Sequence, residues 1–321
     1  MENSARSPIL CVDIGGSSAK AGLLYANGEL IHVDSIATKP DAESFMASLI
    51  QLIAKTRAAP EKDQQPEPIR LGIAVAGFLD PERTCLIYNS NLSWLEGFPL
   101  RRRLQQEFPG LTIELEVDSN AATMAEYRFG SGQGSSRFLC VTSGTGLGVG
   151  MTINGAPLRF AYGCLGDIGH TIVLRDGPLC TCGGRGCAEI LVSAVSVAAN
   201  YKQSINSVQD LSLRDVIEAA HRGETAAISV LQNAGEWLGV AVASMANTFF
   251  PDHIAIAGGL SAGGDFVLKP AERVFRESAC VLARSTARFT RATLGSTATL
   301  IGAACPFWEG ETNEDGKPIS R

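Results

Sequence analysis

The chain has 321 residues, a hydrophobic content of 45% and a formal net charge of -6 at pH 7. This length suits two domains of about 150 residues each, and the acidic balance argues against a nucleic-acid-binding surface. No apolar stretch suits a secretion signal or a membrane span, and nine cysteines fit free thiols and a metal site better than a disulfide framework. We therefore expect a soluble, cytoplasmic protein.

Two glycine-rich segments share one design. Residues 9–24 read ILCVDIGGSSAKAGLL, which predicts a buried strand ending at an acidic residue, a glycine–serine turn and a returning strand. Residues 138–151 read FLCVTSGTGLGVGM and place Thr142 where the earlier segment has Asp13. This repeat predicts two lobes of related build. Either segment alone can be an ordinary hairpin, whereas the pair favours binding of nucleotide phosphates by backbone N–H groups.

Helices and strands are expected to alternate between these segments. The pattern predicts a helix over 41–57, a polar loop over 60–68 and a buried strand over 69–76. The turn-rich segment 89–99, which precedes a further helix, contains Asn91. This asparagine can bind a ligand or simply cap a turn.

A carboxylate stands between the next strand and helix. Residues 111–117 alternate like a strand, and residues 119–129 have a helical period. Asp118 lies between them, where a carboxylate can cap the helix and interact favourably with its dipole. The residues alone support a capping role and a functional role for Asp118 equally.

Three cysteines and a histidine form the most specific pattern in the chain. Cys180, Cys182 and Cys187 lie on glycine-rich loops, and His170 lies one short hairpin upstream. Their spacing predicts a closed, four-ligand zinc knuckle, although three reduced cysteines in a turn are the simpler alternative. With four protein ligands the metal would hold loops in place without activating water.

The rest of the chain predicts the shell of the second lobe. By their period, helices are expected over 193–201, 211–222 and 224–250. A short strand over 252–257 leads into Gly258 and Gly259, which allow close approach of a flat ring or phosphate, and a helix follows to about residue 283. Residues 306–321 are polar, and we expect them to be frayed.

Together these motifs resemble the ROK family of sugar kinases and repressors, a branch of the actin-like ATPase fold. The resemblance runs from Asp13 to about Ile301. It rests on Asp13-x-Gly15-Gly16-Ser17, Gly72 to Asp80, Asn91-Leu-x-Trp94, Asp118-x-Asn120-x-Ala122, Thr142-x-Gly-Thr-Gly-x-Gly148, Gly169-His170, Cys180-x-Cys-Gly-x-x-Gly-Cys187-x-Glu189 and Ile256-x-Gly-Gly259.

The resemblance implies an α/β, ribonuclease H-like fold with two lobes around a cleft. The N-terminal lobe would span 1–117, completed by segment 300–321. The C-terminal lobe would span 118–299, with the zinc knuckle at 166–189. Family members are often dimers or tetramers, so the resemblance also implies a homo-oligomer, with a small sugar as the other partner.

The resemblance further implies ATP-dependent phosphorylation of a sugar hydroxyl, with Asp118 as the general base. Asp13 would act on Mg²⁺ or its waters. Structural zinc would be held by His170, Cys180, Cys182 and Cys187. The sugar site would comprise Gly77, Asn91, Asn120, Asp167, His170 and Glu189. The nucleotide site would comprise Asp13, Gly15, Gly16, Ser17, Lys20, Thr142, Gly144, Thr145, Gly146, Gly258 and Gly259.

Three positions depart from the family pattern near the expected sugar. Val117 stands where the family usually has Asn, Asp167 where it has Glu, and Ala76 where it has Pro. Two of these changes remove or shorten a contact to a sugar hydroxyl, which weakens discrimination by about 1 kcal/mol or more. Our hypothesis is that the preferred substrate is a hexose other than glucose, or a hexose derivative.

Two other functions compete with the kinase. Repressors of the family need an N-terminal helix-turn-helix module, for which we expect no room before Asp13. A catalytically weak sugar-binding sensor without a DNA-binding module remains the alternative, consistent with the altered pocket. Retention of Asp13, Asp118 and both glycine turns favours the kinase.

Overall fold

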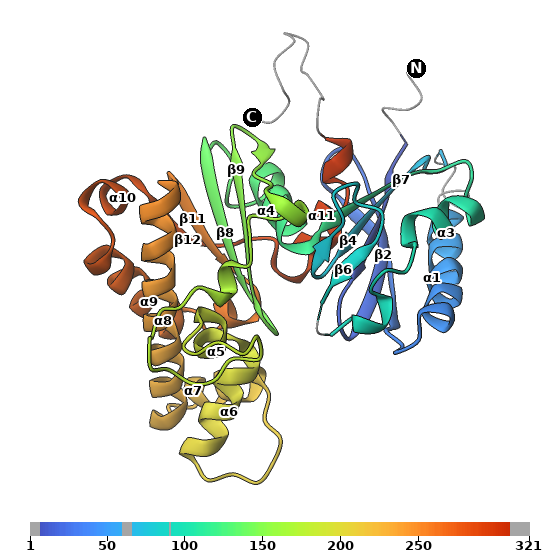
Figure 1. The fold of residues 1–321 in the computed structure, drawn as a ribbon. Coiled ribbons are helices and arrows are strands. Elements are labelled where there is room, and N and C mark those ends of the chain that lie inside the picture. The colour runs from blue at the N-terminus through green and yellow to red at the C-terminus, as the bar shows by residue number, and fades with distance from the viewer. Residues whose placement is uncertain (1–6, 60–65, 90, 309–321) are drawn as a thin grey trace. The chain divides into compact units, whose positions relative to one another are not determined.

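The computed structural model describes residues 7–59, 66–89 and 91–308 (Figure 1). The chain divides into two compact units. The first unit lies within Met1–Gln133, Asn154–Gly166 and Ser296–Arg321, and the second comprises Gly134–Ile153 and Asp167–Gly295. The division differs from the predicted boundary at residue 117, because the helix that follows this residue packs on the first sheet.

The sheet of the first unit has five strands in the order β3-β2-β1-β4-β7. β1 pairs antiparallel with β2 and parallel with β4, and β4 pairs parallel with β7. Because β1, β4 and β7 run in one direction, Asp13 near the end of β1 and Asp118 just after β7 lie toward the same edge of the sheet. The strands are β1 (Ile9–Ile14), β2 (Ser18–Leu24), β3 (Leu30–Ala37), β4 (Arg70–Val75) and β7 (Thr112–Val117).

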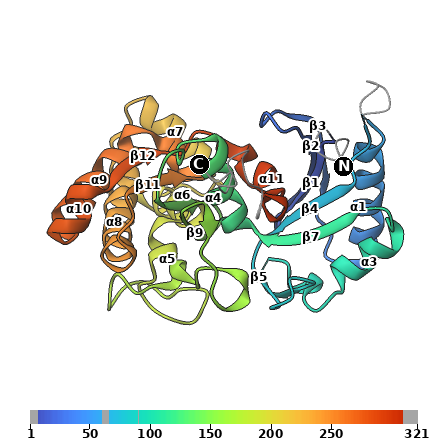
Figure 2. The ribbon, with the colours of Figure 1, turned by 90° about the horizontal axis from the view of Figure 1, so that it is seen from above.

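Helices cover both faces of this sheet (Figure 2). α1 packs against β1, β2 and β3, whereas α11 packs against β1, β2 and β4 from the other side. α1 begins after Asp41, whose carboxylate accepts the N–H of Ser44, and it buries Phe45, Leu49 and Ile53 at helical spacing. The remaining elements of this part are α1 (Ala42–Arg57), β5 (Phe78–Leu79), β6 (Leu86–Tyr88), α3 (Leu100–Glu107), α4 (Asp118–Phe129) and α11 (Ala298–Gly302).

α11 approaches its neighbours so closely that glycines are required. A Cβ atom on Gly302 would lie 1.7 Å from the carbonyl oxygen of Ala121 in α4, and one on Gly72 in β4 would lie 1.9 Å from that of Ala303. α11 therefore holds α4 and β4 in a fixed relation. The N-terminus of α4, where Asp118 lies, is built on this packing.

The second sheet repeats the topology of the first. Its order is β10-β9-β8-β11-β12. β8 pairs antiparallel with β9 and parallel with β11, and β11 pairs parallel with β12. The pair β8 and β9 thus corresponds to β1 and β2, which confirms the predicted repeat. The strands are β8 (Arg137–Ser143), β9 (Leu147–Ile153), β10 (Ala156–Pro157), β11 (His253–Ala257) and β12 (Arg288–Arg291).

In the second unit the long helix α8 packs along α9 and also contacts α5, α6 and α7. The prediction of one helix up to residue 283 is wrong. Ala279 is extended, and the side-chain oxygen of Asn247 accepts the N–H of Cys280 in place of a helical carbonyl. The helices are α5 (Ala188–Val192), α6 (Ala194–Ser204), α7 (Leu213–His221), α8 (Thr225–Phe249), α9 (Asp265–Ser278) and α10 (Val281–Thr286).

Two predicted segments fall outside the described residues. They are 60–65 of the polar loop and 309–321 of the polar tail. Within the described ranges, none of the helices has the length and apolar character that a membrane span requires.

Candidate functional site

In the first unit, the turn after β1 carries the predicted phosphate-binding residues. The N–H of Gly15 donates to the carbonyl oxygen of Ser18 at 3.0 Å, while Gly16 and Ser17 are exposed. Asp13 is half-buried on β1, directly opposite Lys20 on β2. Burial raises the pKa of the Asp13 carboxyl to about 6, and the positive charge of Lys20 acts in the opposite direction.

Asp118 is the first residue of α4, directly after β7. Its Oδ1 accepts the N–H of Ser119 at 2.7 Å. Burial raises the pKa of this carboxyl to about 7, the negative charge of Asp13 adds to the increase, and the Ser119 N–H opposes it. A carboxylate with such a pKa is suited to accept a proton near neutral pH.

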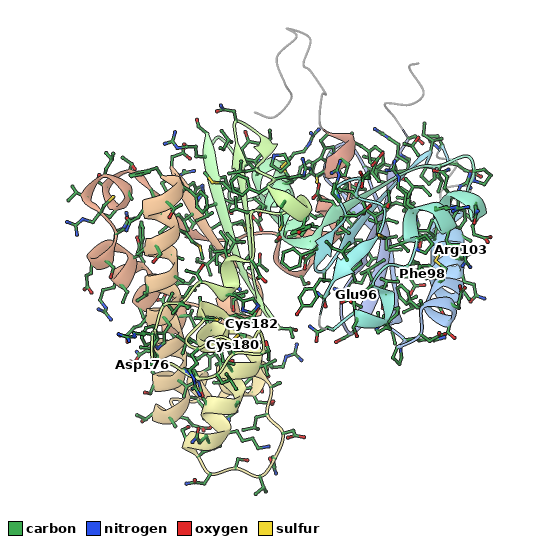
Figure 3. All side chains as sticks on the ribbon, viewed as in Figure 1. Glu96, Phe98, Arg103, Asp176, Cys180 and Cys182 are labelled. Atoms are coloured by element: carbon green, nitrogen blue, oxygen red, sulfur yellow. The ribbon has the colours of Figure 1, made fainter. Side chains whose placement is uncertain are left out.

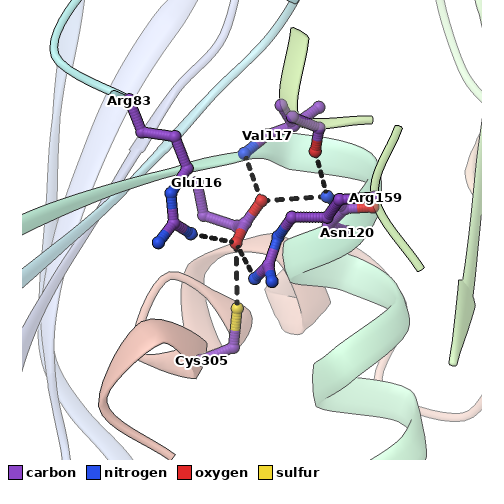
Figure 4. Close-up of polar contacts among 7 residues, drawn as sticks. Arg83, Glu116, Val117, Asn120, Arg159 and Cys305 are labelled. Atoms are coloured by element: carbon purple, nitrogen blue, oxygen red, sulfur yellow. Dashed lines mark hydrogen bonds and ion pairs between the residues drawn. The ribbon is translucent and has the colours of Figure 1, made fainter. Parts of the chain in front are cut away.

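A fully buried carboxylate, Glu116, organises the junction of β7 and α4 (Figure 4). Its Oε2 accepts hydrogen bonds from Arg83 and Arg159, and its Oε1 accepts the N–H of Val117 at 3.0 Å and the amide of Asn120 at 2.9 Å. The network therefore holds the backbone N–H of Val117 and the side chain of Asn120, which lie before and after Asp118 in the sequence. Glu116 was not among the predicted site residues; the signal for it was a carboxylate between the apolar residues Leu115 and Val117 at the end of the strand.

Asn120 lies in this network and not at an accessible surface. It is fully buried, and its amide donates to Glu116 and, at 2.6 Å, to the carbonyl oxygen of Gly163. Only its Oδ1 lacks a hydrogen-bond partner among the described residues. The geometry thus gives Asn120 a role in holding the β7–α4 junction, and its sugar contact stays a prediction.

Two other predicted sugar residues lie on the loops of the first unit. Gly77 has a φ of +111°, and a Cβ atom there would lie 2.5 Å from the carbonyl oxygen of Tyr88, so no larger residue fits. Asn91 is exposed, and its Cβ lies 3.0 Å from where a Cβ on Gly16 would stand. The structure thus brings Asn91 next to the glycine turn after β1.

In the second unit, the four predicted zinc ligands converge. The ligand atoms of His170, Cys180, Cys182 and Cys187 all lie within 4.8 Å of one another. The Sγ atoms of Cys182 and Cys187 are 3.6 Å apart, and the Sγ of Cys180 is 3.5 Å from the Nδ1 of His170. Two sulfurs at ~2.3 Å from a tetrahedral zinc would be about 3.8 Å apart, so the donors fit this metal. Figure 3 shows Cys180 and Cys182 on the loop before α5.

The other nitrogen of His170 faces two carboxylates. Its Nε2 lies 3.7 Å from Oδ2 of Asp167 and 3.9 Å from Oε1 of Glu189. When Nδ1 binds a metal, Nε2 carries the proton and is a hydrogen-bond donor. The structure therefore brings together the three predicted sugar residues of this unit.

The turn between β8 and β9, residues 143–147, lies beside these groups. Thr142, Gly144 and Gly146 are partly exposed and Thr145 is exposed, as a phosphate-binding turn requires. Gly258 has a φ of +81°, and a Cβ atom on it would lie 2.2 Å from the carbonyl oxygen of Ser143. The glycine pair after β11, Gly258 with the exposed Gly259, therefore adjoins this turn.

Comparison with known proteins gives one consistent result. The model of the ROK family matches residues 9–308. A glucokinase of Halalkalibacterium halodurans is 31% identical over 305 residues, covering 91% of this chain and 92% of that protein. A glucokinase of Streptomyces coelicolor is 30% identical over 309 residues, covering 91% and 95%.

A solved structure extends this likeness to the fold. The ROK family glucokinase from Streptomyces griseus, in complex with glucose and AMPPNP, is 31% identical with a TM-score of 0.82, and the match covers 94% of this chain and 99% of that one. The predicted actin-like ATPase fold with two mixed sheets is thereby confirmed. The predicted His/Cys₃ zinc-binding motif is present as well.

Proposed function

Because the chain belongs to the ROK family, we propose that it is an ATP-dependent kinase that transfers the γ-phosphate to a hydroxyl of a hexose or hexose derivative. Support comes from two relatives named glucokinases, which match more than nine tenths of this chain. A third relative has been solved with glucose and AMPPNP bound. We class the protein as a hexokinase-like phosphotransferase on these grounds.

Asp118 is the proposed general base. Its carboxylate accepts the proton of the sugar hydroxyl as the hydroxyl oxygen bonds to the γ-phosphorus, and the bond from that phosphorus to the β-γ bridging oxygen breaks to release ADP. The observation that carries this assignment is a half-buried carboxyl at the start of α4 whose pKa is raised to about 7. Glu116 holds the backbone beside it, so the base needs little reorganisation.

The two glycine turns are the proposed phosphate sites. Asp13, a carboxylate next to an exposed turn of backbone N–H groups, has the donor chemistry for Mg²⁺ or its bound waters. When bound, Mg²⁺ neutralises charge on the transferred phosphoryl group. The turns comprise Gly15, Gly16 and Ser17 with Lys20 beside them, and Thr142, Gly144, Thr145 and Gly146. Gly258 and Gly259 would adjoin the adenosine.

The proposed sugar contacts are the donors and acceptors around His170. Nε2–H of His170 donates a hydrogen bond, and the carboxylates of Asp167 and Glu189 accept hydroxyl protons. Gly77, Asn91 and Asn120 complete the proposed set. Val117 is only 3% exposed and its side chain has no polar atom, which supports our hypothesis of a substrate other than plain glucose.

A sugar panel tests this proposal. ADP formation is measured with ATP and Mg²⁺ in the presence of glucose, fructose, mannose, allose, N-acetylhexosamines or a heptose. We expect sugar-dependent ADP formation with at least one hexose or derivative. A strong preference for glucose would refute the specificity hypothesis alone. Binding of a sugar by calorimetry without any ADP formation would refute the kinase in favour of the sensor.

A further inference from the structure

The β8–β9 turn, residues 143–147, is held by both arms of the zinc knuckle. One arm is Gly169, the residue before the ligand His170: a Cβ atom on Gly169 would lie 2.5 Å from the carbonyl oxygen of Leu147. The other arm is α5, which begins at the residue after the ligand Cys187. Each arm is thus the immediate neighbour in sequence of a zinc ligand, and each packs on the turn.

The second arm, together with Ala194 at the start of α6, is joined to the turn by hydrogen bonds at three points. Oε2 of Glu189 accepts the N–H of Leu147 at 2.9 Å. At the other end of α5, the hydroxyl of Ser143 donates to the carbonyl oxygen of Val192 at 2.8 Å, and the N–H of Ala194 donates to the carbonyl oxygen of Gly144 at 2.8 Å. These bonds fix both ends of the turn to one short segment.

The Glu189 carboxylate also shapes the centre of the turn. A Cβ atom on Gly146 would lie 2.5 Å from its Oε2. Gly144, in turn, donates its N–H to the carbonyl oxygen of Gly146 at 2.9 Å. Movement of Glu189 would therefore release the Leu147 N–H and change the direction of the backbone N–H groups in the turn.

α5 depends on the knuckle for its own position. It has five residues, too few to be stable as an isolated helix. The N–H of Ala188 donates to the carbonyl oxygen of Thr171 at 2.9 Å, and Cys187 forms a β-bridge with Ile172. The two arms are thus paired, and a metal bound by His170 and the three cysteines would cross-link them.

From these contacts we infer that Glu189 is a positioning residue for the nucleotide phosphates: it transmits the state of the zinc knuckle to the β8–β9 turn. The inference rests on the proposed function, in which this turn binds ATP. It goes beyond a sugar contact, because Glu189 then affects nucleotide affinity when no sugar is present. Zinc and nucleotide binding become linked, since both stabilise one conformation of the turn.

The test measures AMPPNP binding by calorimetry with Mg²⁺ and without sugar. The wild type is compared with Glu189→Gln, and with Asp176→Asn as a matched control on an exposed carboxylate of the same loop (Figure 3). Zinc content and melting temperature are recorded for each. We expect Glu189→Gln to bind AMPPNP about tenfold more weakly, the typical worth of a charge-assisted hydrogen bond, and Asp176→Asn to match the wild type.

The outcomes separate the inference from the proposed function. If the wild type binds AMPPNP and Glu189→Gln binds it equally, the inference is wrong and the kinase proposal stands. If the wild type binds no AMPPNP, the proposed function itself fails. Should Glu189→Gln lose its zinc or its fold, Ser143→Ala, which removes the bond to Val192, is measured in the same way. If Ser143→Ala with full zinc content binds AMPPNP a few fold more weakly than the wild type, the inference is supported. If its AMPPNP affinity is unchanged, the inference is contradicted.

Discussion

Asp13 and Asp118 form a pair of carboxyls whose raised pKa values have related causes. Burial acts on both, and the charge of Asp13 raises the pKa of Asp118 further. Nearby like charges disfavour simultaneous ionisation, so each carboxyl depends on the state of the other. A cation bound at Asp13 would therefore favour the ionised form of Asp118, which is the form that accepts a proton.

Removing one charge should shift the titration of the other. In Asp13→Asn, we expect the pKa of Asp118 to fall from about 7 while staying above its ordinary value, because burial remains the larger cause. ¹³C NMR titration of the aspartate carboxyls in the ligand-free protein measures this shift. The matched control is Lys20→Met, which removes a positive charge and should raise the pKa of Asp13. An unchanged Asp118 titration in Asp13→Asn would contradict the coupling.

The ionised carboxylate of Asp118 should also lower the free energy of unfolding at neutral pH. A carboxyl whose folded-state pKa is raised from 3.8 to about 7 favours the folded protein most at low pH, and that contribution is lost as pH rises through this range. Asp118→Asn removes the ionisation, so we expect it to raise the free energy of unfolding by about 4 kcal/mol at pH 8 and by less than about 1 kcal/mol at pH 4. Denaturant unfolding at both pH values measures this difference. Equal effects at pH 4 and pH 8 would count against the raised pKa.

At the scale of elements, the β7–α4 junction is fixed by a buried ionic network. Glu116 is fully buried, while Arg83 and Arg159 are each partly exposed and come from separate loops. A buried carboxylate with two guanidinium partners is costly to leave half-satisfied. The network therefore sets the geometry of the strand end that carries Asp118 and gives the junction little freedom to vary.

Glu116→Gln tests this network. The amide keeps the size of the side chain but leaves two guanidinium groups without their anion, so we expect a loss of about 3 kcal/mol in the free energy of unfolding. The control is Glu114→Gln on the same strand, whose partly exposed pair with Arg101 should be worth at most about 1 kcal/mol. Urea unfolding of both variants measures these free energies of unfolding. If Glu116→Gln loses as little stability as Glu114→Gln, the network contributes little.

At the scale of the whole molecule, the fold followed from short-range patterns. The two strand–turn–strand segments predicted the repeated sheet topology, because alternating apolar residues and glycine turns are local signals. The zinc ligands were found for the same reason, since three of them lie within eight residues of sequence, from Cys180 to Cys187.

Features that depend on distant partners were not predictable in this way. Glu116 acquires its role from arginines 33 and 43 residues away. The break between α9 and α10 depends on Asn247, a side chain of α8, which is 33 residues from Cys280. The hydrogen bond from Leu147 to Glu189 likewise spans 42 residues. In each case a contact between residues distant in sequence overrides, or adds to, the structure that the local sequence pattern predicts.

The two-unit organisation predicts how metal loss acts. All four zinc ligands lie in the second unit. Structural zinc contributes directly to folding free energy. We therefore expect chelation to lower the melting temperature, with amide exchange rising first in the second unit, around residues 167–192, and to abolish activity. Hydrogen exchange followed by mass spectrometry, with zinc added back as the control, measures this. Normal melting and full activity in metal-free protein would remove the structural role of the knuckle.

The central claim is that Asp118 accepts the proton in phosphoryl transfer. It is tested most directly by ³¹P NMR of sugar phosphate formation from ATP and Mg²⁺, comparing the wild type with Asp118→Asn on the best sugar of the panel. Loss of a general base typically costs ~10²–10⁴-fold in rate. We predict at least about 100-fold slower turnover in Asp118→Asn, with AMPPNP affinity unchanged. Turnover within a few fold of the wild type would contradict the assignment.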